Sequence, residues 1–418
     1  MLLFFIATRV PRCDFVAGRP VYDAPMPGER SLSDVLGNSL NQGDLPFSDF
    51  VELALYHPQF GYYAQSVSPV GREGDFITSP LLSPVFSFAI GKLIHEFVNR
   101  AGDGVSQVVD VGCGDGALIR ALAGVGSRGS GVGEGSDPQP SRSPDSAPTP
   151  DPRRLTPSFY GLDRNLGRAQ PDPNVTYVTS LAEIPPAEAR LIISNELFDA
   201  LPFGRVVQRG EELHELWVTE HDGVLDWTEH EADARYDDYF AERGIELDDG
   251  QFADVSLEWS PMYDDLCRFV SRGLIVTFDY GLPQTKLFRG RMRRFGTAAA
   301  YSQHRVSRDL LINPGQQDLT AHINFDDLRL TGERQHFTTR FFDIQAKFLL
   351  ALGAAEHELL QPIGEAAVGS AEEGIVLLDA RDDAKRLILP DGIGAEIRVL
   401  VQEREMGRDD WRFQTKLF

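Results

Sequence analysis

Residues 108–118 read Val-Val-Asp-Val-Gly-Cys-Gly-Asp-Gly-Ala-Leu, an apolar β-branched run that ends in three alternating glycines and continues into helix-forming residues. Glycine lets a chain turn sharply after a strand, and it lets the backbone approach a ligand at a helix N-terminus. The stretch therefore predicts a strand, a ligand-binding turn and a helix, which is the start of a Rossmann-like α/β domain.

Two carboxylates accompany this glycine turn. Asp110 lies two residues before the first glycine, and Asp115 lies inside the turn. Gly112, Gly114 and Ala117 also satisfy the dinucleotide fingerprint, so an NAD-dependent oxidoreductase remains an alternative. Two negative charges would repel a pyrophosphate, whereas a carboxylate can order the ammonium of a methionine-type ligand. The turn therefore favours S-adenosylmethionine over NAD.

A further acid, Asp163, follows the next expected strand. It lies 53 residues after Asp110, but the Gly-, Pro- and Ser-rich stretch 124–157 interrupts this interval. Such a stretch cannot bury enough apolar surface to order itself, and we expect it to be a disordered insertion. Without its 34 residues the interval is 19, close to the spacing of about 20 at which Rossmann-like domains place the acid for the ribose hydroxyls. The alternative is that Asp163 only caps a turn.

Short β-branched runs alternate with helical or polar stretches along the chain, which predicts a parallel sheet buried on both faces. These runs are residues 107–111, 158–162, 175–178, 189–194 and 273–278.

Other elements are expected around this sheet. The dipeptide Asp222-Gly223 predicts a hairpin over 214–227, and Ser83 followed by a proline predicts the start of a helix. The remaining predictions are helices over 46–56, 84–100 and 338–352, the last closed by Gly353, and strands over 373–378 and 397–402.

We expect one elaborated α/β core and not two independent domains. Its predicted parts are an N-terminal extension (1–45), a helical segment covering the cofactor crevice (46–104), a Rossmann-like core (105–285) with a hairpin insertion at about 213–255, and a C-terminal part that completes the sheet and the acceptor site (286–418).

Three polar side chains follow the expected strand 189–194: Asn195, Glu196 and Asp199. Ligands of doubly wound sheets bind at the carboxyl ends of the strands, so these side chains should face the glycine turn. Carboxylates can orient a guanidinium through paired charged hydrogen bonds. The structural alternative is that Asn195 and Asp199 are helix caps and Glu196 is a surface acid.

The charge balance excludes some partners. The chain has 418 residues, with 40 Lys+Arg against 63 Asp+Glu and a formal net charge of −23 at pH 7. This field repels polyphosphates, so we expect a protein partner with a basic acceptor segment and no nucleic acid. Three widely spaced cysteines and scattered histidines predict no metal site. No apolar run approaches the ~18–20 residues of a membrane span, and we expect no membrane insertion.

The first residues are ambiguous as a targeting signal. An apolar run over 1–7 is followed by Arg9, Arg12 and Arg19, whereas a secretory signal places its positive charges first. We expect a cytoplasmic protein, with the mitochondrial matrix as the alternative if this segment is a transit peptide.

Several motifs, in this order, resemble the MidA-like S-adenosylmethionine-dependent methyltransferases, a family that includes the mitochondrial protein arginine methyltransferase acting in respiratory complex I assembly. Several motifs in the right order are more specific than any glycine turn. They are LYHPQFGYYA (55–64), GDFITSP (74–80), the glycine turn, NELFDALP (195–202), SLEWSP (256–261), FDYG (278–281), and PGQQDLTAHINF (314–325) followed by FFDIQAKFLLALG (341–353).

The resemblance implies a Rossmann-like class I methyltransferase core with N-terminal helical and C-terminal additions, S-adenosyl-L-methionine as cofactor, and a protein arginine as acceptor. A non-catalytic assembly chaperone with the same fold is the alternative. The family commonly has Glu where this chain has Asp110 and Asp163, which shortens the reach of both acids. The implied cofactor contacts are Gly74, Asp75, Asp110, Gly112, Gly114, Gly116 and Asp163, and the implied catalytic side chains are Asn195, Glu196, Asp199 and His322, with Asp318 near them.

Overall fold

A computed structural model describes residues 31–64, 78–127, 156–289, 293–302, 305–362, 371–407 and 410–414. The predictions for residues 1–30, for most of the insertion 124–157, and for Gly74 and Asp75 fall outside these described residues. Within the described residues, no helix is long and apolar enough to cross a membrane.

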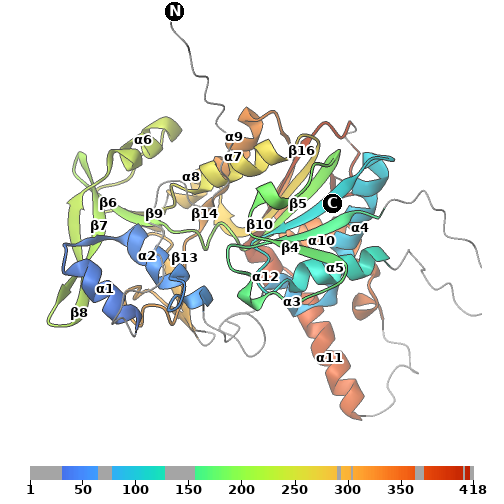
Figure 1. Ribbon diagram of the computed structural model, residues 1–418, viewed down its shortest axis with the longest axis horizontal. Coiled ribbons are helices and arrows are strands. Elements are labelled where there is room, and N and C mark those ends of the chain that lie inside the picture. Colours follow the sequence, from blue (N-terminus) through green and yellow to red (C-terminus); the bar gives the residue numbers. More distant parts are fainter. Residues whose placement is uncertain are drawn as a thin grey trace, which may run out of the picture.

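The centre of the molecule is a sheet with the strand order β15-β16-β10-β5-β2-β3-β4, to which β14 adds beside β10 (Figure 1). The five strands from β10 to β4 are parallel, as predicted, and β16 and β15 close one side in antiparallel pairing. The bounds are β2 (Ser106–Val111), β3 (Ser158–Leu162), β4 (Val175–Val178), β5 (Ala189–Asn195), β10 (Gly273–Leu282), β14 (Ile323–Asn324), β15 (Thr338–Ile344) and β16 (Ile397–Arg404).

Both faces of this sheet are buried, because alternate strand residues enter two different apolar cores. Val108 packs with Phe86 and Phe278 on one face, while its neighbour Val109 packs with Trp259 on the other. The first core is covered by helices α4 (Pro84–Ala101), α5 (Ala117–Ser127) and α10 (Gln345–Ala351), and the second by α7 (Trp259–Phe269) and α9 (Phe325–Arg334).

The predicted start of α4 is confirmed. The Ser83 side chain accepts a hydrogen bond from the Val85 backbone N–H, and Pro84 occupies the first turn, where its missing N–H costs nothing. Buried Phe86 and Phe97 then anchor the helix on the sheet that carries the glycine turn.

A second, five-stranded sheet lies beside the central one (Figure 1). It contains the predicted hairpin, whose turn residues Asp222 and Gly223 have φ values of 52° and 81°. Its strands are β1 (Leu45–Pro46), β6 (Gly204–Arg209), β7 (Glu212–His221), β8 (Val224–Glu231) and β9 (Phe252–Val255), and α6 (Ala234–Arg243) follows the hairpin.

Residues 31–45, which we had included in the N-terminal extension, belong to the folded body. Helix α1 (Leu32–Leu40) buries Leu32, Val35 and Leu36 in the apolar core that also holds α2 (Phe47–Tyr56). The same core is closed by a small sheet of the order β12-β11-β13, with β11 (Ala299–Ser302), β12 (Arg305–Ser307) and β13 (Asp318–Thr320).

Two predictions of secondary structure are wrong. Residues 338–344 form strand β15 instead of the first half of a helix, and only residues 345–351 are helical, although Gly353 does follow the helix end with φ of 87°. Residues 373–378 lie in helix α11 (Ala371–Arg386), which projects from the body of the molecule (Figure 1). A helix satisfies its own backbone there, whereas a strand needs a neighbour. The remaining helices are α3 (Ser79–Leu82), α8 (Gln284–Leu287) and α12 (Ile393–Glu396).

Candidate cofactor and acceptor site

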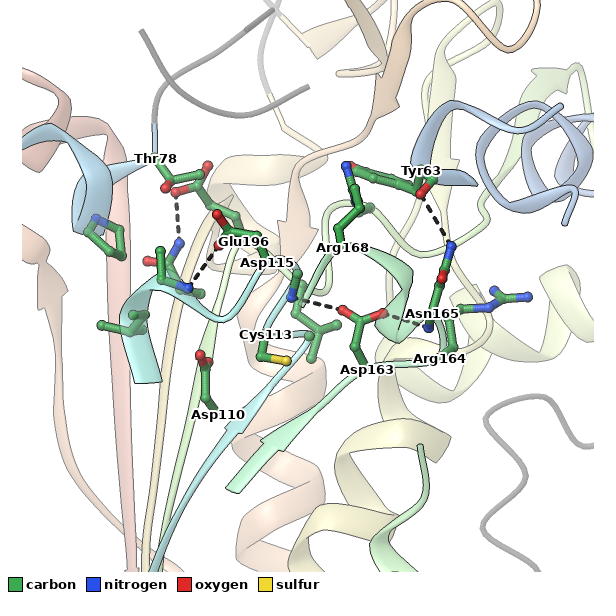
Figure 2. A pocket seen from close by; sticks show the side chains of 18 of the residues that line it. Tyr63, Thr78, Asp110, Cys113, Asp115, Asp163, Arg164, Asn165, Arg168 and Glu196 are labelled. Carbon is green, nitrogen blue, oxygen red and sulfur yellow. Dashed lines mark hydrogen bonds between the residues drawn. The ribbon is translucent and has the colours of Figure 1, made fainter. Parts of the chain in front are cut away.

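A cavity of about 500 Å³ opens at the carboxyl ends of β2, β3 and β5. This is where doubly wound sheets bind ligands, and the volume is within the range of small-molecule sites. Its walls are the glycine turn, residues 163–168 and 195–200, the start of α3, and two tyrosines, Tyr56 at the end of α2 and Tyr63 shortly after it. Figure 2 shows the acids Asp110, Asp163 and Glu196 around this cavity.

The glycine turn has a backbone that other residues rarely adopt. Gly112, Gly114 and Gly116 have φ values of 76°, 56° and 78°. Gly116 is also in close contact with Tyr177 of β4, because a Cβ added to Gly116 would lie 2.3 Å from the tyrosine oxygen. Glycine is therefore required at this position both by its φ and by the neighbouring ring.

Asp163 links the glycine turn to the end of β3. Its Oδ2 accepts the Gly114 backbone N–H at 2.9 Å, and its Oδ1 accepts the Asn165 N–H at 2.9 Å (Figure 2). Asp163 thus does cap a turn, as the structural alternative held. A carboxylate has about four acceptor positions, so two remain for a ligand in the cavity that this side chain lines.

Asp110 is the most enclosed acid of this wall. Its side chain is 2% exposed, lines the cavity, and has no hydrogen-bond partner in the described part of the chain. Burial raises the pKa of Asp110 to about 7, and the charges of Asp163 and Asp115 add to the effect. An unpaired buried carboxylate is costly, so Asp110 fits a ligand that brings a positive charge, as S-adenosylmethionine does.

Glu196 is held in an unusual backbone conformation. It has φ of 52°, in the left-handed region that a non-glycine residue enters only when its surroundings require it. Its backbone N–H donates to Phe278 O at 2.9 Å, and its Oε1 accepts from Asn195 Nδ2 at 2.9 Å. Burial and the charge of Asp199 raise the pKa of Glu196 to about 8. The carboxyl is thus aimed into the cavity at an energetic cost.

Three more carboxyl groups lie behind Glu196, on Asp199, Asp279 and Asp318. Burial raises the pKa of Asp199, and the charges of the other two raise it further; Asp199 and Asp279 hydrogen-bond to each other, so one of them carries a proton. The Tyr63 hydroxyl donates to Asp318 Oδ1 at 2.9 Å. We call Glu196, Asp199, Asp279 and Asp318 the carboxyl cluster.

Asp279, at the end of β10, positions the turn that carries Glu196. Its Oδ2 accepts the backbone N–H groups of Leu197, at 3.2 Å, and Phe198, at 2.8 Å. Burial raises the pKa of Asp279 to about 7. Sequence reasoning missed this residue as a site residue, although its place directly after the apolar run 273–278 is the signal that identified Asp163 and Glu196.

The structure brings most of the predicted site residues together. Gly116 and Asp199 lie behind the cavity wall. The predicted residues that line it directly are Asp110, Gly112, Gly114, Asp163, Asn195 and Glu196.

His322 is not among the residues that line this cavity, so its place in the active site stays a prediction. Its backbone N–H donates to Thr297 Oγ1 at 3.1 Å. Burial lowers the pKa of His322 to about 4, and the positive charges of Arg293 and Arg308 lower it further. The ring is therefore neutral at pH 7, and the charged groups that act on it are Arg293, Arg308 and Asp254.

The tyrosines Tyr56 and Tyr63 are lining residues that the sequence analysis did not single out. Their rings stack with centroids 5.4 Å apart, and the Tyr56 hydroxyl donates to Ala200 O at 2.8 Å. The Arg164 guanidinium lies 4.3 Å from the Tyr56 ring centroid and pairs with Glu52 at 2.7 Å. These contacts attach α2 to the end of β3, so the N-terminal helices form one side of the cavity.

Comparison with known proteins agrees with this geometry. Residues 154–342 match the model of a family described as "Putative S-adenosyl-L-methionine-dependent methyltransferase". The solved structure of a Burkholderia thailandensis protein bound to S-adenosyl-homocysteine superimposes with a TM-score of 0.72 at 24% identity, covering 92% of this chain and 96% of that chain. This likeness shows that the two chains share a fold.

Two curated relatives extend over most of the chain. The mitochondrial protein arginine methyltransferase NDUFAF7 homologue of Drosophila melanogaster is 26% identical over 329 residues, covering 73% of this chain and 71% of its own. The Caenorhabditis elegans homologue is 27% identical over 344 residues, covering 76% of this chain and 74% of its own. The family model over residues 154–342 and the two curated relatives show that this chain is similar to S-adenosyl-L-methionine-dependent methyltransferases of the MidA-like family.

Proposed function

We propose that this protein transfers the methyl group of S-adenosylmethionine to a guanidinium nitrogen of an arginine in another protein. The observation that carries the proposal is that Glu196, a member of the carboxyl cluster, lines the same cavity as the glycine turn. The relatives named above are protein arginine methyltransferases, which supports the same acceptor chemistry.

The glycine turn, Asp110 and Asp163 would hold the cofactor. When bound, S-adenosylmethionine supplies a methyl group that is already activated on a sulfonium, so the protein contributes position and charge more than chemistry. Asp163 has acceptor positions left for ribose hydroxyls, and Asp110, which has no hydrogen-bond partner among the described residues, is suited to a cationic group.

Glu196 would receive the acceptor. A guanidinium binds a carboxylate through two parallel charged hydrogen bonds, which presents its nitrogens in a fixed orientation. When a methyl group bonds to a guanidinium nitrogen, that nitrogen releases one proton. Burial raises the pKa of Glu196 to about 8 in the free protein, and a bound guanidinium would favour its ionised form, which would then accept this proton and return it to solvent.

The cofactor is tested first, by isothermal titration of the protein with S-adenosylmethionine and S-adenosylhomocysteine. We expect micromolar binding of both, weakened in Asp110→Ala. Absence of binding at millimolar concentration would refute the proposal. The acceptor is tested next with radiolabelled S-adenosylmethionine and peptide pairs that differ only by arginine or lysine. Product mass spectrometry should show methylarginine alone, and equal labelling of the lysine peptides would refute arginine as the acceptor.

We propose a respiratory complex I subunit as the first acceptor protein to examine, as the family resemblance implies. Peptide mass spectrometry of these subunits, from cells with and without this gene, should reveal one methyl increment that depends on it. In a gene replacement with Glu196→Gln, the increment should also be lost. Normal subunit maturation in that strain would instead favour the non-catalytic chaperone. The same cells establish whether the protein is cytoplasmic or, as the names of its relatives state for them, mitochondrial.

A further inference from the structure

The cationic residues of this acidic chain are unevenly distributed. Residues 280–308 contain seven Lys and Arg and no Asp or Glu, in a protein whose net charge is −23. The end of this stretch forms the hairpin of β11 and β12 and the segment that leads into it. We define the basic strip as Arg293, Arg294, Phe295, Arg305, Val306 and Arg308.

The arginines of the basic strip differ from most others in the part of the chain that the structure describes. Within the described residues, none of Arg293, Arg294, Arg305 and Arg308 forms an ion pair, although Arg294 and Arg308 each donate to a backbone carbonyl, of Asp249 at 3.2 Å and of Ala298 at 2.9 Å. Other arginines of the molecule do form ion pairs. Arg205, for example, pairs with Asp254 at 2.9 Å, so this acid beside the strip is already engaged by an arginine outside it. Burial and the positive charge of Arg308 lower the pKa of Arg293, which places the two cations close together. In the sequence, Asp309 directly follows Arg308, and residues 310–317 after it contain no further acid.

The basic strip also exposes large apolar side chains. Phe295 is 69% exposed and Val306 is 62% exposed. Arginine and aromatic residues together are typical of protein interfaces, where an apolar anchor is surrounded by charged contacts. The composition of this surface therefore indicates a binding face for a protein of opposite charge.

Arg305 and Val306 of the basic strip belong to the same small sheet as Asp318 of the carboxyl cluster. Strand β11 pairs with β12 on one side and with β13 on the other, and Tyr301 of β11 lies opposite Asp318 of the carboxyl cluster. The Ala321 N–H after β13 donates to Asp199 O at 3.2 Å, so this sheet is attached to the turn behind Glu196. Two strand spacings separate β12 from β13, which is about 10 Å.

We propose that the basic strip binds an acidic segment of the acceptor protein, which flanks the residue to be methylated. This inference rests on the proposed function and specifies its substrate class. An extended chain covers about 3.3 Å per residue, so the acidic residues should begin about three to five residues from the acceptor arginine. The site then distinguishes acceptors by two charges of opposite sign: a cation for the carboxyl cluster and carboxylates for the strip. The net charge of this chain alone would favour a basic acceptor segment. The basic strip instead requires acidic residues near the acceptor arginine.

The test uses two fluorescent peptides, each with one central arginine, that differ only in glutamates or glutamines beginning about four residues from it on both sides. Binding is measured by anisotropy with the full chain, and methyl transfer by radiolabelled S-adenosylmethionine. We expect the glutamate peptide to bind about tenfold more tightly, with a lower KM, an equal kcat and a marked sensitivity to salt.

The variants are Arg305→Glu/Arg308→Glu and the milder Arg305→Gln/Arg308→Gln, both at exposed positions. Both should abolish the preference for the glutamate peptide while S-adenosylmethionine binding and kcat stay unchanged. The matched control is Lys385→Glu/Arg386→Glu on α11, which changes the net charge by the same amount as Arg305→Glu/Arg308→Glu and should keep the preference.

Three outcomes would overturn the inference: equal affinity for both peptides, a preference that survives in both strip variants, or displacement of the glutamate peptide by an RNA oligonucleotide at lower concentration than by the peptide itself. The proposed function fails separately. If the glutamate peptide binds through the strip but no arginine is methylated, the inference holds and the arginine activity does not. If both peptides are methylated with equal KM, the arginine activity holds and the inference about the basic strip fails.

Discussion

The two sides of the cavity are assembled from the chain in different ways. The cofactor side comes from one stretch, residues 110–116, and the end of the adjacent strand β3. The acceptor side combines residues near positions 63, 196–199, 279 and 318, which only the completed fold brings together. The proposed cofactor side offers a strained backbone and Asp110, an acid without a hydrogen-bond partner in the described residues, whereas the proposed acceptor side offers carboxyls that interact with one another. Mutations should therefore have local effects on the first side and coupled effects on the second.

Glu196→Gln should have the largest effect. It keeps the hydrogen-bonding shape but removes the charge that would hold a guanidinium, so kcat should fall by about 10²–10³-fold. S-Adenosylmethionine affinity should change by less than about twofold, because the cofactor side is separate. Glu188→Gln, at an exposed position, is the control. Steady-state kinetics and isothermal titration check both values, and an equal loss in both would contradict the division between the two sides.

Asp110→Asn should affect the cofactor side alone. The variant keeps the size of the side chain but removes the charge opposite a cationic ligand, so S-adenosylmethionine affinity should fall by about 10- to 100-fold. The KM for the acceptor peptide should stay the same at saturating cofactor. Asp103→Asn on the surface serves as control. A raised peptide KM in Asp110→Asn would mean that the two sides are coupled.

The buried acids should make the cofactor-free protein less stable at high pH. The pKa values of Asp110 and Glu196 are raised from 3.8 to about 7 and from 4.5 to about 8, so the folded state binds protons more tightly than the unfolded chain does. Stability should then decrease as the pH rises from about 4 through about 8. Between pH 6 and pH 9 we expect Tm to fall by several degrees, and by less in Asp110→Asn/Glu196→Gln. Calorimetry measures Tm against pH, with Glu188→Gln as the control. If Tm falls as steeply with pH in Asp110→Asn/Glu196→Gln as in the wild type, these two acids do not cause the loss of stability.

Tyr63→Phe should have the smallest effect. It removes only the hydroxyl that donates to Asp318, which is worth about 1 kcal/mol, so the peptide KM should rise by roughly fivefold. Cofactor affinity should remain that of the wild type. Tyr62→Phe, its neighbour on the short helix η1 (Tyr62–Ala64), is the matched control. A change in cofactor affinity alone would place Tyr63 on the other side of the cavity.

Much of the fold could be predicted because its signals are local. Each parallel strand is a short β-branched run, and the Asp222-Gly223 turn and the Ser83 cap depend on adjacent residues. The error over 338–344 arose because the phenylalanines there have helical spacing, whereas the strand is stabilised by pairing with β16, about 60 residues later. The error over 373–378 arose because its apolar run of four residues, 375–378, fits a strand or a helix equally well.

The site divides in the same way. Asp110, Asp163 and Glu196 could be predicted because each lies beside the end of an apolar run, and Asp279 could have been found by the same rule. Tyr63 could not, because its contact with Asp318 joins residues 255 positions apart. The role of His322 stays a prediction, because its segment borders the carboxyl cluster through the Ala321 backbone while the charges of Arg293 and Arg308 act on its ring.

The contact between Tyr177 and the glycine turn limits how this protein could be re-engineered. A Cβ added to Gly116 would lie 2.3 Å from the Tyr177 oxygen, and one added to Gly161 of β3 would lie 2.8 Å from the same ring. The turn after β2, strand β3 and strand β4 are thus tightly packed against one another around the Tyr177 ring. A chimera that imports the glycine turn from another methyltransferase should fail unless Gly161 and Tyr177 are exchanged with it, so the smallest transferable cofactor module spans β2 to β4.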